Sequence, residues 1–203
     1  MNARWQQLPL IVAFLAASTS GAAIILYALG WVTLTYSVTF LAPLSAILFL
    51  ALLARSRWGQ KHVFVNRLIG GLIAGVAGLA AYNLVRLLIL FSGQVPFNPF
   101  RPIEVYGLLI LDRYEDTTLT KAVGWGFHIW NGLSFALMYT LAVGPGHLLW
   151  GLGWAMLLEI AMLATYPTIF HLTMNWPFIT VSLVGHVAYG LAIGATARRV
   201  VKW

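Results

Sequence analysis

The sequence predicts an all-α fold, a polytopic membrane protein with one transmembrane helical domain over residues 1–203 and a bundle of six transmembrane helices. Three observations predict this class. First, 61% of the residues are hydrophobic and only 8% are charged, against about 25% charged in soluble domains. Second, the apolar residues gather in runs of about 20, the length that a helix needs to cross a bilayer. Third, most basic residues flank these runs instead of interrupting them.

The same composition excludes several classes of protein. Twelve basic and five acidic residues cannot cover the surface of a soluble globule of this length. The absence of Cys excludes thiolate metal ligands, iron–sulfur clusters and disulfides. A net charge of +7 is also found in nucleic-acid-binding proteins, but here the basic residues lie beside membrane spans. We therefore expect no nucleic acid partner. The expected partners are the lipid bilayer and other integral membrane proteins or further copies of this chain.

Six apolar runs define the predicted spans. They cover residues 8–29, 32–53, 65–92, 122–143, 147–166 and 177–197. The first two contain no charged residue. Each of the other four contains one ionisable side chain in its interior. In chain order these side chains are Arg86, His128, Glu159 and His186.

The charged residues outside the spans or near their ends predict the orientation. If all six spans cross, one side of the membrane carries eight basic residues and no acidic one, namely Arg4, Arg55, Arg57, Lys61, Arg67, Arg198, Arg199 and Lys202. The other side carries three basic and four acidic residues. Because basic residues concentrate on the cytoplasmic side of membrane proteins, we expect both termini in the cytoplasm.

The longest segment between spans, 93–120, is expected on the outer side. Pro96, Pro99 and Pro102 open it and favour an extended backbone. Residues 103–111 are apolar again but too few to cross the bilayer, so we expect a short interfacial or re-entrant helix. Acidic residues follow this helix.

The four buried ionisable groups are predicted to lie at one depth. Each is seven to nine residues from the outer end of its span, which corresponds to about 10–14 Å at the helical rise. Residues spaced by three or four positions share a helix face, so polar neighbours accompany these groups. The expected intramembrane polar cluster consists of Arg86, Asn83, Asn131 and Tyr189.

An ionisable group inside a membrane costs about 3 kcal/mol on insertion scales and needs an explanation. One interpretation is structural: Arg86 pairs with Glu159, and neutral histidines form hydrogen bonds. A second is a metal site of Zn, Cu or Fe on His128, Glu159 and His186. A third is haem b with His128 and His186 as axial ligands. A proton path through Glu159, and acid–base chemistry on a lipid, use the same residues.

No motif assigns an enzyme class. The sequence has no phosphate-binding loop, no nucleophile elbow and no Lys within a span, so catalytic residues are not assigned and enzyme activity stays open. The leading prediction is a small integral subunit of a larger redox, energy-conversion or oxidative membrane assembly, with a metal or haem at the polar cluster. The alternative is a self-sufficient transporter or membrane-embedded metalloenzyme or other enzyme that acts on a lipophilic substrate.

Overall fold

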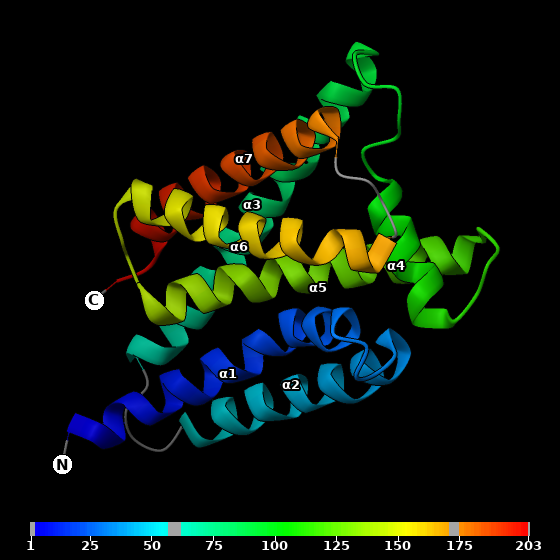
Figure 1. Ribbon diagram of the computed structural model, residues 1–203. Helices are drawn as coiled ribbons and strands as arrows, with labels where there is room; N and C mark the ends of the chain where they lie inside the picture. The colour runs from blue at the N-terminus through cyan, green and yellow to red at the C-terminus, as the bar shows by residue number, and fades with distance from the viewer. Residues whose placement is uncertain (1–2, 57–61, 171–174, 203) are drawn as a thin grey trace.

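The computed structural model describes residues 3–56, 62–170 and 175–202 (Figure 1). These residues form seven helices and no strand, which confirms the all-α prediction. The helices are α1 (Ala3–Ala28), α2 (Leu34–Ser56), α3 (His62–Ser92), α4 (Arg101–Leu111), α5 (Thr118–Ala142), α6 (Leu148–Phe170) and α7 (Trp176–Val200).

Five of the described helices, α1, α2, α3, α6 and α7, are long and apolar enough to cross a membrane. This agrees with an integral membrane protein. The predicted fourth span, 122–143, lies within α5, which is not among the five, so six spans are not confirmed. The reason is composition: α5 carries Lys121, His128, Asn131 and several glycines, which lower its mean hydropathy.

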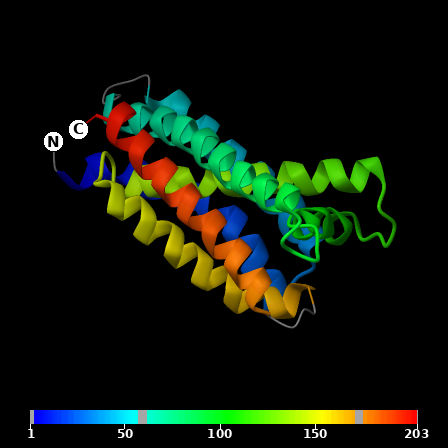
Figure 2. The ribbon, with the colours of Figure 1, turned by 90° about the horizontal axis from the view of Figure 1, so that it is seen from above.

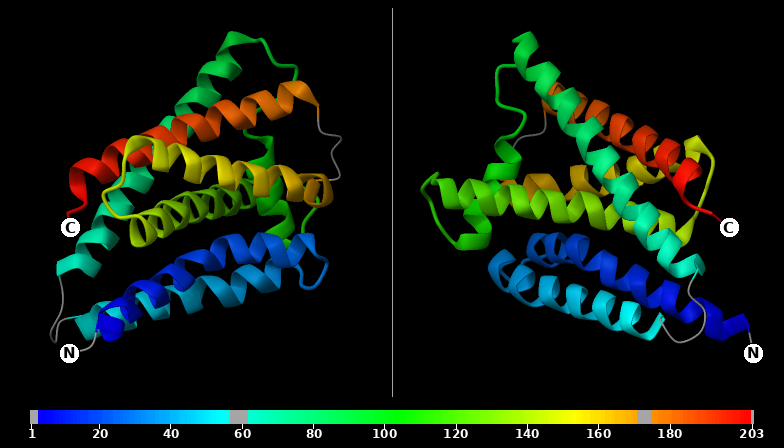
Figure 3. Two further views of the ribbon diagram at one scale, coloured as in Figure 1. Left: turned by 60° about the vertical axis from the view of Figure 1, so that its left-hand side comes forward. Right: turned by 180° about the vertical axis from the view of Figure 1, so that it is seen from behind.

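Five helices pack in a closed ring. Along this ring α1 contacts α5, α5 contacts α3, α3 contacts α7, α7 contacts α6, and α6 returns to α1. Figure 3 shows α3 running diagonally across the other helices. Helix α2 is outside the ring and packs mainly on α1, as Figure 1 also shows.

Glycines allow the ring helices to approach closely. In α3, Gly75 faces the backbone of Leu133 in α5 at a distance that leaves little space for a side chain. In α6 and α7, Gly151 and Gly190 face each other, so these two helices touch through their backbones. Small residues permit such approach between membrane helices. The side chains of α6 and α7 near this contact are therefore brought within hydrogen-bonding distance.

The short helix expected in the outer segment is present as α4, but an interfacial position is not confirmed. One face of α4 is buried, with Ile103, Tyr106 and Ile110 among its buried residues, and it packs against α5. The extended backbone expected from the three prolines is interrupted by bends at residues 95–97 and a turn at residues 99–100, before the helix that contains Pro102. This residue lies in the first turn of α4, where its missing N–H group leaves no hydrogen bond unmade.

The ends of the bundle differ in charge. The start of α1 and the end of α7 lie at one end, and α4 lies with the start of α5 at the other (Figure 2). Arg55, Arg198 and Arg199 belong to the first end, because they lie in the last residues of α2 and α7. The four acidic residues 104, 112, 115 and 116 lie in α4 and in the segment after it.

Candidate functional site

A cavity of about 60 Å³ lies inside the helix ring, enough space for a few water molecules. Every ring helix and α4 contribute to its wall. One lining residue from each of α1, α3, α4, α5, α6 and α7 is, in that order, Ile24, Arg86, Tyr106, His128, Met162 and His186. Helix α2 contributes none. The ring therefore encloses the cavity, and α4 covers part of it.

Glu159 of α6 and His186 of α7 form a buried pair beside this cavity. Their side chains are 2% and 6% exposed, and Nδ1 of His186 lies 2.7 Å from Oε2 of Glu159. The same Nδ1 is 3.0 Å from the carbonyl oxygen of Ser182, and the Ser182 hydroxyl donates to Oε2 of Glu159 at 2.8 Å. Because both neighbours of Nδ1 are acceptors, we assign the proton to this nitrogen.

With the proton on Nδ1, the other ring nitrogen of His186, Nε2, has a free lone pair. His186 lines the cavity, and its Nε2 makes no hydrogen bond to a described residue. A carboxylate that accepts from one imidazole nitrogen orients the ring and makes the other nitrogen a better proton acceptor. The pair can therefore exchange a proton with a molecule in the cavity through Nε2.

Arg86 of α3 is the second feature of the site. It is 3% exposed, and its Nη1 donates to the carbonyl oxygen of Pro99 at 3.0 Å. The guanidinium carbon lies 4.4 Å from the centre of the Tyr82 ring, and Nε has no hydrogen-bond partner. The expected ion pair with Glu159 is not formed: in the part of the chain that the structure describes, no carboxylate oxygen lies within 4 Å of this guanidinium. The Glu159 carboxylate is bound by α7 instead.

His128 of α5 lines the cavity separately from the buried pair. Its Nε2 lies 3.1 Å from the amide oxygen of Asn83 in α3. The Tyr82 ring contacts both imidazoles, with centroid distances of 5.6 Å to His128 and 5.2 Å to His186. The structure thus brings Arg86 and both histidines to one cavity, around the ring of Tyr82.

The remaining members of the expected polar cluster also reach this region. Asn131 lines the cavity, and its amide oxygen has no hydrogen-bond partner. Tyr189 lines it too, and its hydroxyl donates to the carbonyl oxygen of Gly132 at 2.6 Å, which joins α7 to α5.

The geometry does not support the expected cofactors. Within residues 3–56, 62–170 and 175–202, no three His, Asp or Glu side chains are close enough to hold a metal ion. His128 is bonded to Asn83, away from the Glu159–His186 pair. Haem ligation by His128 and His186 is not supported either, because Nε2 of His128 is bonded to Asn83 and Nδ1 of His186 to Glu159.

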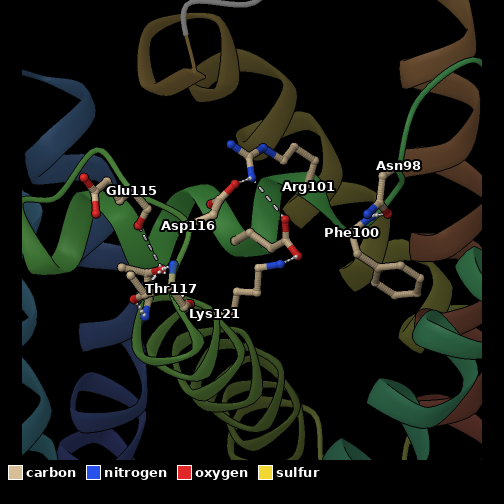
Figure 4. A network of polar contacts seen from close by, with 9 residues as sticks. Asn98, Phe100, Arg101, Glu115, Asp116, Thr117 and Lys121 are labelled. Carbon is tan, nitrogen blue, oxygen red and sulfur yellow. Dashed lines mark hydrogen bonds and ion pairs between the residues drawn. The ribbon is translucent and has the colours of Figure 1, made fainter.

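Helix α4 is held over the cavity by an ionic network (Figure 4). Arg101 bonds Glu104 at 3.1 Å and Asp116 at 2.5 Å, and Lys121 of α5 lies 3.6 Å from Glu104. The hydrogen bond to Asp116 raises the pKa of Arg101, and partial burial opposes this effect. Most of the network is exposed, so it contributes little to the stability of the fold.

The backbones of α4 and α5 also touch. A side chain at Gly107 would overlap the carbonyl oxygen of Thr120, and one at Gly124 would overlap the carbonyl oxygen of Ile103. Thr117 begins α5 with a reciprocal cap, in which its hydroxyl accepts from the Thr120 N–H. Helix α4 is therefore positioned by packing as well as by charge.

Sequence reasoning did not place α4 at the site, and so it missed Tyr106. The signal was present: Ile103, Tyr106, Gly107 and Ile110 follow the spacing of one buried helix face. The carbonyl group of Pro99, which accepts from Arg86, has no sequence signal.

Comparison of the chain with protein-family models, with curated proteins and with solved structures gives no match.

Proposed function

We propose that the chain crosses the membrane six times, with both termini in the cytoplasm. Helix α5 has 25 residues, enough to cross, and it packs against α1 and α3, which are long apolar helices. Its polar side chains His128 and Asn131 line the cavity, so they do not require contact with lipid. The basic end of the bundle then faces the cytoplasm, and α4 lies at the outer interface.

We further propose that the protein is a small membrane-embedded enzyme that acts on a lipophilic substrate by acid–base chemistry. One observation carries this proposal: the Glu159–His186 pair is buried beside a cavity, with Nδ1 bound to the carboxylate and Nε2 without a hydrogen bond to any described residue. The wall around the pair is largely apolar, with Ile24, Leu79 and Phe135 among its residues. Such a wall favours an apolar molecule with a small reactive group.

The proposed step is a proton transfer. The lone pair on Nε2 of His186 takes a proton from an O–H or activated C–H group of the substrate, and the electrons of the broken bond stay on the substrate. The Glu159 carboxylate, 2.7 Å from Nδ1, stabilises the imidazolium ion that forms. The same nitrogen then returns the proton to the product.

The interpretation of the protein as a subunit of a larger membrane assembly stays a prediction. The feature that favours it is α2, which presents a stripe of exposed apolar residues made of Tyr36, Phe40, Leu44, Ile47 and Leu50. A lipid bilayer covers such a stripe as well as a partner protein does. The cavity therefore supports the enzyme proposal more directly.

The proposal predicts that a small lipophilic molecule copurifies with the protein. The test compares Ile24→Trp, which fills the cavity wall, with Ile25→Trp, whose parent side chain is 50% exposed on the outside of the same helix. Solvent extracts of the purified proteins are analysed by mass spectrometry. We expect a molecule that is present in the wild type and in Ile25→Trp and is depleted in Ile24→Trp.

Conversion of that molecule separates an enzyme from a binding protein. The wild type should convert it, and His186→Gln and Glu159→Gln should lose conversion while they still bind it. If the extracts of the two tryptophan variants are identical, the binding site is wrong. A molecule that binds to the wild type but is never converted contradicts the enzyme proposal.

A further inference from the structure

The buried side chain of Arg86 indicates which chemical group the cavity binds. Its guanidinium is buried, it lines the cavity, and no carboxylate of the described residues pairs with it. One of its nitrogens donates to the Pro99 carbonyl oxygen, and Nε donates to none of the residues that the structure describes. A buried cation whose donors are only partly used is costly in a membrane unless an anion reaches it.

From this arrangement we infer that the cavity binds the carboxylate group of a lipophilic acid, with Arg86 as its anchor. This inference rests on the proposed function, because it names the class of substrate for the same site. A planar carboxylate matches the fork of donors on a guanidinium. The apolar side chains Ile24, Leu79 and Phe135 then contact the beginning of the hydrocarbon chain.

Charge favours a carboxylate over a phosphate. The positive charge of Arg86 and the negative charge of Glu159 are the formal charges of the site when His186 is neutral. With His186 neutral, as the proposed proton transfer requires, a bound carboxylate leaves one net negative charge at the site. A phosphate that carries two charges leaves two, and such excess charge is costly in a buried site.

The test measures binding of three probes with the same hydrocarbon chain to the full chain in lipid nanodiscs: oleate, oleyl alcohol and oleyl phosphate, with empty nanodiscs as the blank. We expect saturable oleate binding that is weakened about tenfold or more by Arg86→Gln. Arg86→Lys keeps the charge and should restore part of the affinity. Arg199→Gln removes an exposed charge at the other end of the bundle and should bind like the wild type.

Helix content and thermal unfolding confirm that each variant is folded before binding is compared. If Arg86→Gln binds oleate as tightly as the wild type, or if oleyl phosphate binds more tightly than oleate, the carboxylate inference is wrong. Equal binding of oleyl alcohol and oleate, abolished by Ile24→Trp, overturns this inference but leaves the proposed lipophilic site intact. If no probe binds in a manner sensitive to Ile24→Trp, both are contradicted.

Discussion

At the scale of residues, the site depends on which groups compensate the buried carboxylate of Glu159. Oε2 accepts from Ser182 and from His186, whereas Oε1 has no hydrogen-bond partner among the described residues. Breaking a buried pair by removing one partner costs about 3–5 kcal/mol, because the other group stays buried and uncompensated. A buried ion pair does not by itself show a stabilising role. The position of this pair beside a cavity favours a functional role instead.

The depth of each ionisable side chain was predictable from the sequence, but its partner was not. Helical rise fixes the level of a residue within its span, so Arg86, His128 and His186 were expected near one another, and they line one cavity. The expected pairing of Arg86 with Glu159 was wrong, because pairing depends on which helices touch. That contact is set by Gly151 and Gly190, which bring α6 against α7.

At the scale of elements, α4 covers part of the cavity. It is short, but its buried face supplies Ile103 and Tyr106 to the cavity wall. A short apolar helix in this segment was expected from the sequence, and its position against α5 was not. That position follows from Gly107 and Gly124, whose missing side chains let two backbones meet.

A pair of glycine variants in α5 tests this packing. In Gly124→Ala the new methyl group would overlap the carbonyl oxygen of Ile103, whereas Gly126→Ala has no atom within 4 Å of the added carbon. We expect Gly124→Ala to destabilise the fold by about 1–3 kcal/mol, and Gly126→Ala to leave stability unchanged or raise it slightly. Thermal unfolding in detergent measures both. Equal midpoints for the two variants would show that α4 does not lie against α5 as described.

At the scale of the whole molecule, the main features are the helix ring and the difference in charge between its two ends. The helix bounds follow the apolar runs to within a few residues, because run length and hydropathy determine where a chain enters and leaves a bilayer. The fifth span was expected to end at residue 166, but α6 continues through Pro167 to Phe170. Helix α5 is not among the helices apolar enough to cross a membrane, and two of its polar side chains, His128 and Asn131, line the cavity.

Cysteine labelling tests the number of crossings and their direction. The sequence has no Cys, so single substitutions give an unambiguous signal. Tyr114→Cys lies before α5 and is at a position 97% exposed, and His147→Cys lies after α5 at an exposed position. In intact cells, a membrane-impermeant maleimide should label the first and spare the second until the membrane is permeabilised. Labelling of both variants would mean that α5 does not cross, and the reverse pattern would invert the orientation.

The protonation of His186 is the most direct test of the central claim that a carboxylate orients this imidazole toward the cavity. Nitrogen-15 NMR of histidine-labelled protein in nanodiscs distinguishes the two ring nitrogens, and His186→Gln assigns the signal. We predict a proton on Nδ1 of His186, hydrogen-bonded to Glu159, and a marked change of that resonance in Glu159→Gln. A neutral ring with its proton on Nε2, or a resonance unaffected by Glu159→Gln, would contradict the account.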